Sequence, residues 1–257
     1  MSESEFLCLG VSRNCREYYA QGIELATGAL VRLVGSRPDL RFNGLNLGQL
    51  RVEGMGSRRR MRPLDVVRLA IGERYSTRQH RENRILEHRL NDKPIPLIRN
   101  AAQDIGLVKE IREWAVSSSA AELLFNSDET SNPISNDDKF PMSFFIVESE
   151  HLWWRKTTEY IKNRSTIDLG SGPSIEGRFD FGVFRTRYCL PVGDIAWERN
   201  CATMIPGDRF IENKKLNEIL NVPPELDTLL TISLDDDLIK FDRRFKFIAG
   251  ILHLPKL

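Results

Sequence analysis

The chain has 257 residues, enough for one large domain or two of ordinary size, since a domain takes roughly 100 to 200 residues. Hydrophobic residues make up 41% and charged residues 28%, which is typical of soluble globular proteins and excludes wholesale disorder and a fibrous repeat. With 37 Lys and Arg against 36 Asp and Glu, the net charge of +1 gives no overall attraction to polyanions, so any such attraction must come from local charge.

The first predicted element is a strand over residues 6–11, where apolar residues follow one another. A hairpin comes next, in which residues 22–25 and 29–34 flank a turn whose Gly28 supplies the positive φ. Alternation along the second arm puts Arg32 on the same face as two apolar residues. Arg32 therefore belongs either to a ligand site at a barrel mouth or to a sheet edge. We expect the start of a β-barrel with arginines that reach inward.

An arginine-rich zone follows at residues 51–100, with 13 Lys and Arg against 6 Asp and Glu. Twelve of the thirteen are arginine, which suits bidentate phosphate contacts and base stacking. We expect the densest stretch, residues 57–62, to be a loop between strands whose guanidinium groups follow a phosphate backbone. A solvated loop or a contact with a partner protein is the alternative. The stretch carries Arg58, Arg59, Arg60 and Arg62.

A strand over residues 64–71 and a helix over residues 101–115 come next. The helix is predicted from apolar residues at helical spacing, with Asn100 and Gln103 as a capping arrangement. The polar, acidic stretch at residues 126–138 has no periodicity and is the natural boundary. It would be a linker or loop between an N-terminal barrel with an inserted helix, residues 1–125, and a C-terminal barrel, residues 139–257. No internal repeat is strong enough to identify.

The second half is richer in strand signals, and one helix is predicted at about residues 212–220, before two prolines. The strands are predicted at residues 143–148, 152–160, 174–181, 183–190, 229–234 and 245–254. Together with those of the first half, they are enough for two small barrels.

The run Trp153-Trp154-Arg155-Lys156 joins two indoles to two cations. Neighbouring side chains of a strand point to opposite faces, so one indole should fill the core while the other offers a stacking platform for a base. Trp154 is our candidate for the platform. A structural role for both indoles is the alternative.

No motif for catalysis or metal binding stands out. Glu176 and Asp180 would share one face of a strand but lie about 13 Å apart, too far to hold one ion. The run Asp235-Asp-Asp237 suits a solvated turn better than a metal site. Neither a nucleophile elbow nor a P-loop is present. We expect a protein without cofactor that is not an enzyme; a metal-dependent nuclease with carboxylates from distant strands is the remaining alternative.

Two features bear on the compartment. No apolar run approaches the roughly 18 residues of a membrane-spanning helix, and the first residues are acidic where a signal peptide is basic. The four cysteines are too few for a disulfide scaffold of this size and lack Cys-x-x-Cys spacing, so we expect reduced thiols. A cytoplasmic protein is predicted.

The chain resembles the prokaryotic dual OB-containing domain family, in which two OB-like β-barrels lie in one polypeptide. The resemblance runs almost from end to end, with departures at Asn14, Leu30 and Leu33, where the family has lysine, tryptophan and proline. It rests on residues 12–14, 19–22, 30–34, 64–67, 79–83, 232–234 and 245–249.

The resemblance implies a mainly β fold (β-rich α+β) of two OB-like β-barrels with inserted helices. Because OB barrels bind single-stranded nucleic acid, it also implies a non-enzymatic nucleic-acid-binding or sensing module for single-stranded DNA or RNA. Such a module would act with a partner effector protein in a prokaryotic defence or mobile-element system. The alternative is a structural adaptor that docks the effector. The family's polar residues that survive are candidates for a shared site, namely Ser12, Arg13, Arg32, Glu82 and Asn83.

Overall fold

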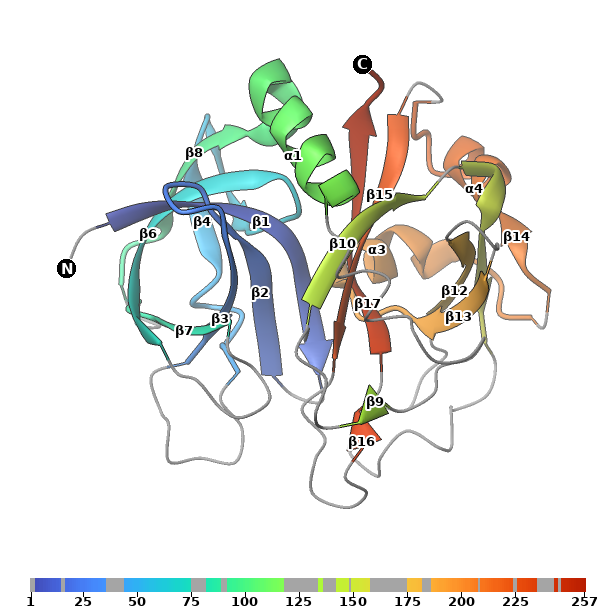
Figure 1. Cartoon of the computed structure of the whole chain (residues 1–257), viewed down its shortest axis with the longest axis horizontal. Helices are drawn as coiled ribbons and strands as arrows, with labels where there is room; N and C mark the ends of the chain where they lie inside the picture. Colours follow the sequence, from blue (N-terminus) through green and yellow to red (C-terminus); the bar gives the residue numbers. More distant parts are fainter. Residues whose placement is uncertain are drawn as a thin grey trace.

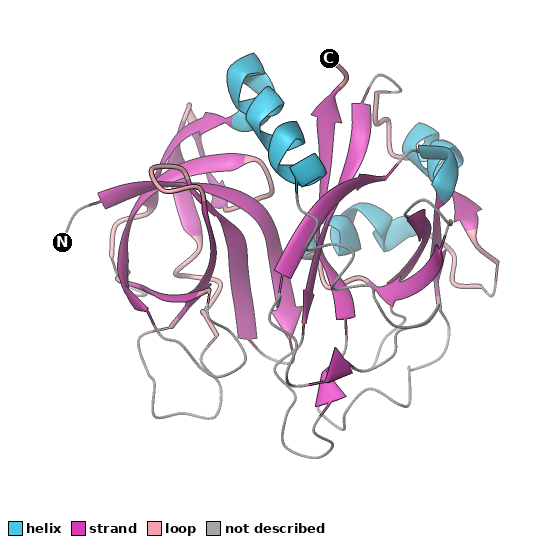
Figure 2. Cartoon of the chain, in the orientation of Figure 1, coloured by secondary structure: helices cyan, strands magenta, loops and turns pink. Residues whose placement is uncertain are grey.

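Strands dominate the computed structural model, which forms two β-barrels side by side (Figures 1 and 2). The first barrel is blue to green in Figure 1 and the second is yellow to red. The predicted mainly β fold of two barrels with inserted helices is confirmed. The structure describes residues 3–14, 17–35, 44–74, 82–88, 92–117, 134–135, 142–147, 149–157, 175–181, 186–207, 209–223, 226–234, 243–244 and 246–257.

Five strands close the first barrel. Their order around the ring is β1-β2-β3-β7-β6, and β6 pairs with β1 again. The pairing of β3 with β7 is parallel, and the other pairs in the ring are antiparallel. Gly28, with φ 66°, forms the turn between β2 and β3, as predicted. The strands are β1 (Glu3–Asn14), β2 (Glu17–Glu24), β3 (Ala29–Val34), β6 (Asp65–Arg74) and β7 (Asn83–Leu86).

Three further strands extend the sheet of the first barrel. β8 (Ile95–Asn100) pairs with β6, and β4 (Arg51–Gly54) joins β8 and carries β5 (Ser57–Arg60) at the edge. The expected loop at residues 57–62 is therefore wrong for its first four residues, which are a strand. Four consecutive polar residues gave no strand signal because no apolar alternation marks them.

The second ring has the same connectivity as the first. The place of β1 is taken by two consecutive strands, β10 and β11, with the short helix η2 (Ser149–His151) between them. β12 and β13 correspond to β2 and β3, and β15 and β17 correspond to β6 and β7. A parallel bridge from Val192, just after β13, to Ile248 in β17 closes this ring. The strands are β10 (Met142–Val147), β11 (Leu152–Lys156), β12 (Ile175–Phe181), β13 (Thr186–Pro191), β15 (Leu226–Leu234) and β17 (Lys246–Pro255).

Helices cover the ends and the seam of the barrels. The helix α1 (Ile105–Ser117) follows the 3-10 helix η1 (Ala101–Gln103). The side chain of Asn100 accepts a hydrogen bond from the N–H of Ala102. Asn100 therefore caps this short 3-10 helix, whereas the predicted α-helix begins only at Ile105, where Asp104 accepts the N–H of Leu107 at 3.1 Å. The other short elements are α3 (Ile195–Asn200), η3 (Cys201–Thr203), α4 (Asn213–Ile219), β14 (Ile211–Glu212), β9 (Ile134–Ser135) and β16 (Arg243–Arg244).

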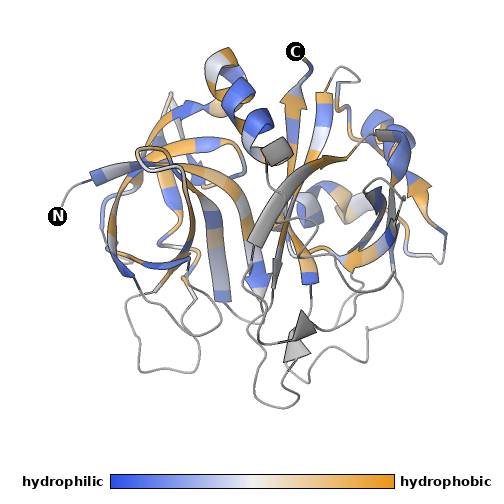
Figure 3. Cartoon of the chain, viewed as in Figure 1, coloured by the Kyte–Doolittle hydropathy of each residue, from blue (hydrophilic) through white to orange (hydrophobic). Residues whose placement is uncertain are grey.

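Apolar side chains fill three layers: one inside each barrel and one between them. The third layer joins Leu7 and Leu9 of β1 to Leu252 of β17, and α1 covers it. Figure 3 shows apolar and polar segments along the strands. The first seven residues of β17 are all buried, because its two faces belong to two of these layers. The two barrels therefore share a core at their seam.

The backbones of β1 and β17 cross closely at this seam. Each strand carries an extra residue in a β-bulge, Leu9 in one and Ala249 in the other, followed by Gly10 and Gly250. A Cβ on Gly250 would lie 2.0 Å from the carbonyl oxygen of Leu9, and one on Gly10 would lie 2.6 Å from that of Ala249. Only glycine allows so close an approach.

The predicted linker at residues 126–138 lies outside the described residues, except for Ile134–Ser135, which pair with β16. The division into residues 1–125 and 139–257 stays a prediction.

Lowering the pH should destabilise the folded protein through His253. This ring packs on Trp197, with 5.7 Å between the centroids, and burial lowers its pKa to about 4 from an ordinary 6.5. The unfolded chain takes up a proton below pH 6.5, whereas the folded one does not until about pH 4. Stability that is present above pH 6.5 is therefore lost toward pH 4, by about 3 kcal/mol.

We would measure this as the difference in unfolding free energy between the wild type and His253→Leu, by urea titration from pH 7.5 to 4. Comparing the two proteins is necessary because Asp194, whose pKa burial raises to about 6, acts in the opposite direction and is present in both. A difference that does not change with pH would contradict the prediction.

Candidate functional site

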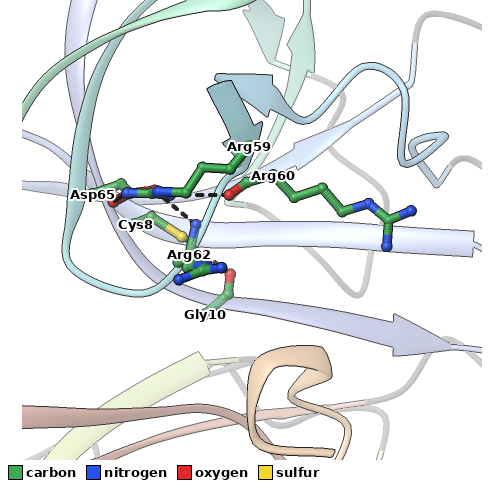
Figure 4. A network of polar contacts seen from close by, with 6 residues as sticks. All are labelled: Cys8, Gly10, Arg59, Arg60, Arg62 and Asp65. Atoms are coloured by element: carbon green, nitrogen blue, oxygen red, sulfur yellow. Dashed lines mark hydrogen bonds and ion pairs between the residues drawn. The ribbon is translucent and has the colours of Figure 1, made fainter. Parts of the chain in front are cut away.

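A buried ion pair locks β5 onto the first barrel (Figure 4). The two terminal nitrogens of Arg59 each donate to an oxygen of Asp65 at 2.6 Å, and the N–H of Arg62 donates to the same carboxylate at 2.8 Å. Asp65 is fully buried, and its hydrogen bonds raise the pKa of Arg59. Arg59 thus has a structural partner, and its expected phosphate contact has no support in this geometry.

Cys8 lies beside this pair, inside the barrel (Figure 4). Its thiol is within 3.6 Å of the carbonyl oxygen of Gly10, and burial raises the pKa of the thiol well above its ordinary value. The protonated thiol is a poor nucleophile, and Cys8 packs as a core residue.

The other arginines of the stretch face solvent. Strand alternation sends Arg58 and Arg60 to the side opposite Arg59, and both are exposed, as is Arg62 beyond the strand. Arg60 lies across from Arg51 on β4, which is also exposed. We call residues 51–60 the arginine hairpin.

Several predicted polar residues gather on the outer face of the first barrel. Arg32 lies opposite Asn83 on one side and Gln21 on the other, so these side chains share one face. Ser12 lies opposite Tyr19, two residues before Gln21, on the same face. We call Ser12, Gln21, Arg32 and Asn83 the polar row.

The polar row is buried beneath the second barrel. The side-chain amide of Gln21 donates to the hydroxyl of Ser233 in β15 at 3.0 Å. The guanidinium of Arg32, 2% exposed, lies 4.1 Å from the ring centroid of Tyr19. The neighbours Val31 and Leu33, by contrast, pack inside the barrel. The expectation that Arg32 reaches inward is wrong, and so is the sheet-edge alternative, because β3 lies between β2 and β7.

The remaining predicted residues lie beside the row. Glu82 accepts the N–H of Arg32 through its carbonyl at 3.0 Å, and Arg13 donates its N–H to the carbonyl of Gly193 at 3.0 Å. Among the described residues, Ser12 Oγ, Gln21 Oε1 and Asn83 Oδ1 find no hydrogen-bond partner. The sequence thus brought most of this cluster together but missed Gln21, which the hairpin register pairs with Arg32.

Trp154 is the wrong indole for a stacking platform. It is fully buried in the second barrel, where its Nε1 donates to Asn213 at 2.8 Å and its ring lies 4.8 Å from that of Trp197. The two neighbouring indoles point to opposite faces as predicted, but Trp154 is the one that fills the core. Trp153 lies on the outer face and is half-buried.

Trp153 begins a row of stacked aromatic and cationic groups. The guanidinium of Arg178 lies 4.6 Å from the centroid of the Trp153 ring and 4.8 Å from that of Phe210. The guanidinium of Arg155 lies 4.6 Å from the Phe210 ring and forms an ion pair with Glu176. We call Trp153, Arg178, Phe210 and Arg155 the ladder. Among the described residues, Arg178 forms no ion pair.

The ladder lies outside the sheet formed by β11, β12 and β13. Residues that alternate with its members, such as Leu152 and Ile175, pack in the barrel core. Cys189, directly opposite Arg178, is half-buried, and burial raises the pKa of its thiol to about 11. A thiol with this pKa stays protonated, so the face offers stacking surface and positive charge without a nucleophile.

The carboxylates considered for metal binding have cationic partners. Glu176 pairs with Arg155, and Asp180 pairs with Arg187 at 3.2 Å. Within the part of the chain that the structure describes, no three His, Cys, Asp or Glu side chains cluster as metal ligands would. Asp235–Asp237 lie outside that part. None of the described helices has the length and apolarity to cross a membrane.

A family model described as a dual OB-containing domain matches residues 4–251. Comparisons with curated proteins and with solved structures give no match.

Proposed function

Since the chain belongs to the dual OB-containing domain family, we propose that it is a nucleic-acid-binding module that holds single-stranded DNA or RNA on its second barrel. OB barrels bind oligonucleotides across the face of their second and third strands. In the second ring these strands are β12 and β13. Arg178 of the ladder lies on β12, and Trp153 and Arg155 lie beside it on the neighbouring strand β11. The ladder is the observation that carries the proposal.

The chemistry of the ladder fits unpaired bases. A base stacks on an aromatic ring irrespective of its identity, which contributes roughly 1 to 3 kcal/mol per base. The guanidinium of Arg178 already lies over two rings, so a base at Trp153 would extend an existing row of ring and guanidinium contacts. Phosphates of the same strand would meet the guanidinium groups of Arg178 and Arg187. Binding should therefore be tolerant of sequence and sensitive to salt.

The exposed cations of the arginine hairpin and the neighbouring Arg62 support the proposal from the first barrel. Arg58, Arg60 and Arg62 would add long-range attraction for a polyanion, although the net charge of the chain is only +1. The polar row is buried between the barrels, and we assign it no phosphate contact. A place in a defence or mobile-element system, an effector partner, the adaptor role and the cytoplasmic location stay predictions.

Trp153→Ala and Arg178→Ala should each weaken binding of a fluorescent 15-nucleotide thymidine or uridine oligomer by about tenfold, because each removes roughly 1.4 kcal/mol of stacking or charge contact. Fluorescence anisotropy at low salt measures this. Arg199→Ala, an exposed arginine of α3, is the matched control and should change affinity by less than about twofold.

Trp153 is half-buried, so its replacement could also lower the stability of the fold. The melting temperature of each variant therefore distinguishes a loss of binding from a loss of folding. Arg178→Gln provides a second variant that keeps a planar side chain but removes the charge. If both arginine variants bound as tightly as the wild type, the ladder would not be the binding face. A wild type that binds neither oligomer at low salt but co-purifies with a protein would favour the adaptor role.

A further inference from the structure

The tip of the arginine hairpin carries a residue that neither the turn nor the core requires. Met55 and Gly56 have φ angles of 51° and 70°, so both occupy the left-handed region in a two-residue turn between β4 and β5. Such turns favour Asn-Gly, because an ordinary side chain at the first position is strained. The Met55 side chain is 58% exposed. A large apolar group is thus presented to solvent at a strained position.

The hairpin behind this tip is firmly anchored. Val52 is fully buried in the core of the first barrel, and Arg59 is held by Asp65 through two hydrogen bonds of 2.6 Å. Gly54 rests against β8, where a Cβ would lie 2.3 Å from the carbonyl oxygen of Leu97. A force on the tip would therefore be transmitted to the barrel wall.

The outward face of the hairpin is cationic. Arg58 and Arg60 face solvent on β5, with Arg51 across from Arg60 and Glu53 across from Arg58. Three exposed guanidinium groups and one carboxylate thus lie along the two strands behind an apolar tip. Proteins that bind the DNA minor groove combine the same two elements. Arginines contact the groove and the phosphates, and an apolar side chain inserts between two base pairs and unstacks them.

We propose that the arginine hairpin is a wedge for double-stranded DNA: Met55 enters a base step, and Arg58 and Arg60 hold the flanking phosphates. The exposed arginines favour a polyanion as the partner. An apolar side chain on a rigid support favours a duplex over a flexible single strand, because it can insert between stacked base pairs. This inference goes beyond single-strand binding at the ladder, because it concerns another nucleic-acid form and another barrel. It does not require the ladder to bind.

The test uses a 20-base-pair DNA duplex with 2-aminopurine beside a central TA step, the kind of step that unstacks most readily. Saturating wild-type protein should raise the fluorescence of 2-aminopurine about twofold or more as the base loses its neighbour. Met55→Ala should bind with an affinity within about threefold of the wild type yet give no rise, because the phosphate contacts remain. Met55→Leu should restore the rise.

Arg58→Ala and Arg60→Ala test the other half of the wedge. Each should lower the slope of log affinity against log salt by about 1, since each removes one phosphate contact. Ile205→Ala, which removes an exposed apolar side chain elsewhere, should behave as the wild type. Trp153→Ala should leave the duplex signal unchanged, which separates this test from that of the ladder.

The proposal is overturned if the wild type fails to bind the duplex at low salt, or binds it without a rise in fluorescence. It is also overturned if Met55→Ala gives the same rise as the wild type. Met55→Gly relieves the strained turn as well as removing the side chain, so it should be folded at least as stably as the wild type and give no rise.

Discussion

Replacing Asp65 by alanine should lower the free energy of unfolding by about 3 to 5 kcal/mol, because it leaves the guanidinium of Arg59 partly buried without its partner. The same variant removes the acceptor for the N–H of Arg62. Urea unfolding followed by tryptophan fluorescence measures the change. Arg59→Ala should cost a similar amount, since it leaves a fully buried carboxylate unpaired.

A double variant distinguishes the net contribution of the ion pair from the cost of leaving one buried charge without its partner. Arg59→Met with Asp65→Leu removes both charges and should recover most of the loss, because neither desolvated charge remains. Asp227→Ala breaks a more exposed ion pair, with Arg112, and should cost about 1 kcal/mol. A loss below about 1 kcal/mol in Asp65→Ala would show that the pair does not hold the hairpin.

This prediction bears on every binding experiment with the arginine-rich stretch. A triple change of Arg58, Arg59 and Arg60 to alanine would also break the ion pair with Asp65, so a loss of binding would not report on the exposed pair alone. The informative variants therefore change Arg58 and Arg60 and keep Arg59.

Gly250→Ala should destabilise the protein by about 3 kcal/mol, because the new Cβ would meet only backbone atoms. Its nearest neighbours are the carbonyl oxygen of Leu9 at 2.0 Å and the Cα of Gly10 at 2.7 Å. Neither can rotate away, so β1 and β17 must move apart. This movement would also stretch the 2.9 Å hydrogen bond from the hydroxyl of Thr231 to the carbonyl of Leu9.

Chemical denaturation of the variant and wild type measures the effect. Gly207→Ala is the matched control, because a Cβ at that position has no neighbour within 4 Å, and it should change stability by less than about 0.5 kcal/mol. If Gly250→Ala were as stable as Gly207→Ala, the close crossing would not contribute to holding the barrels together.

The sequence predicted those parts of the fold that depend on local pattern. Runs of apolar, β-branched and aromatic residues identified most strands of both rings, Gly28 identified the first turn, and Asn100 identified a cap. The hairpin at residues 51–60 was not predicted because its second strand is Ser-Arg-Arg-Arg, which pairs with β4 and is held to the barrel by the contact of Arg59 with Asp65. The contact with a buried carboxylate, which sequence does not show, replaces an apolar side chain there.

The sites were harder to predict because they depend on contacts between distant residues. Alternation correctly placed Trp153 and Trp154 on opposite faces, but only the pairing of β11 with the rest of its barrel decides which face is the core. Arg32 was identified as unusual, yet it lies in a buried row whose next member, Gln21, contacts Ser233 of the second barrel, 212 positions away along the chain. Phe210 gave no sequence signal as a member of the ladder.

The crossing of β1 and β17 also determines when the fold can be completed. As the chain leaves the ribosome, the first barrel can close as soon as β7 is made and α1 follows soon after, but the layer around Leu7 and Leu9 lacks its residues from β15 and β17 until residues 226–255 follow. The nascent first barrel therefore carries an apolar seam through most of synthesis, a surface that chaperones bind and that promotes aggregation. Changes in β17 should thus lower the yield of folded protein in cells more than expected for a strand of its length.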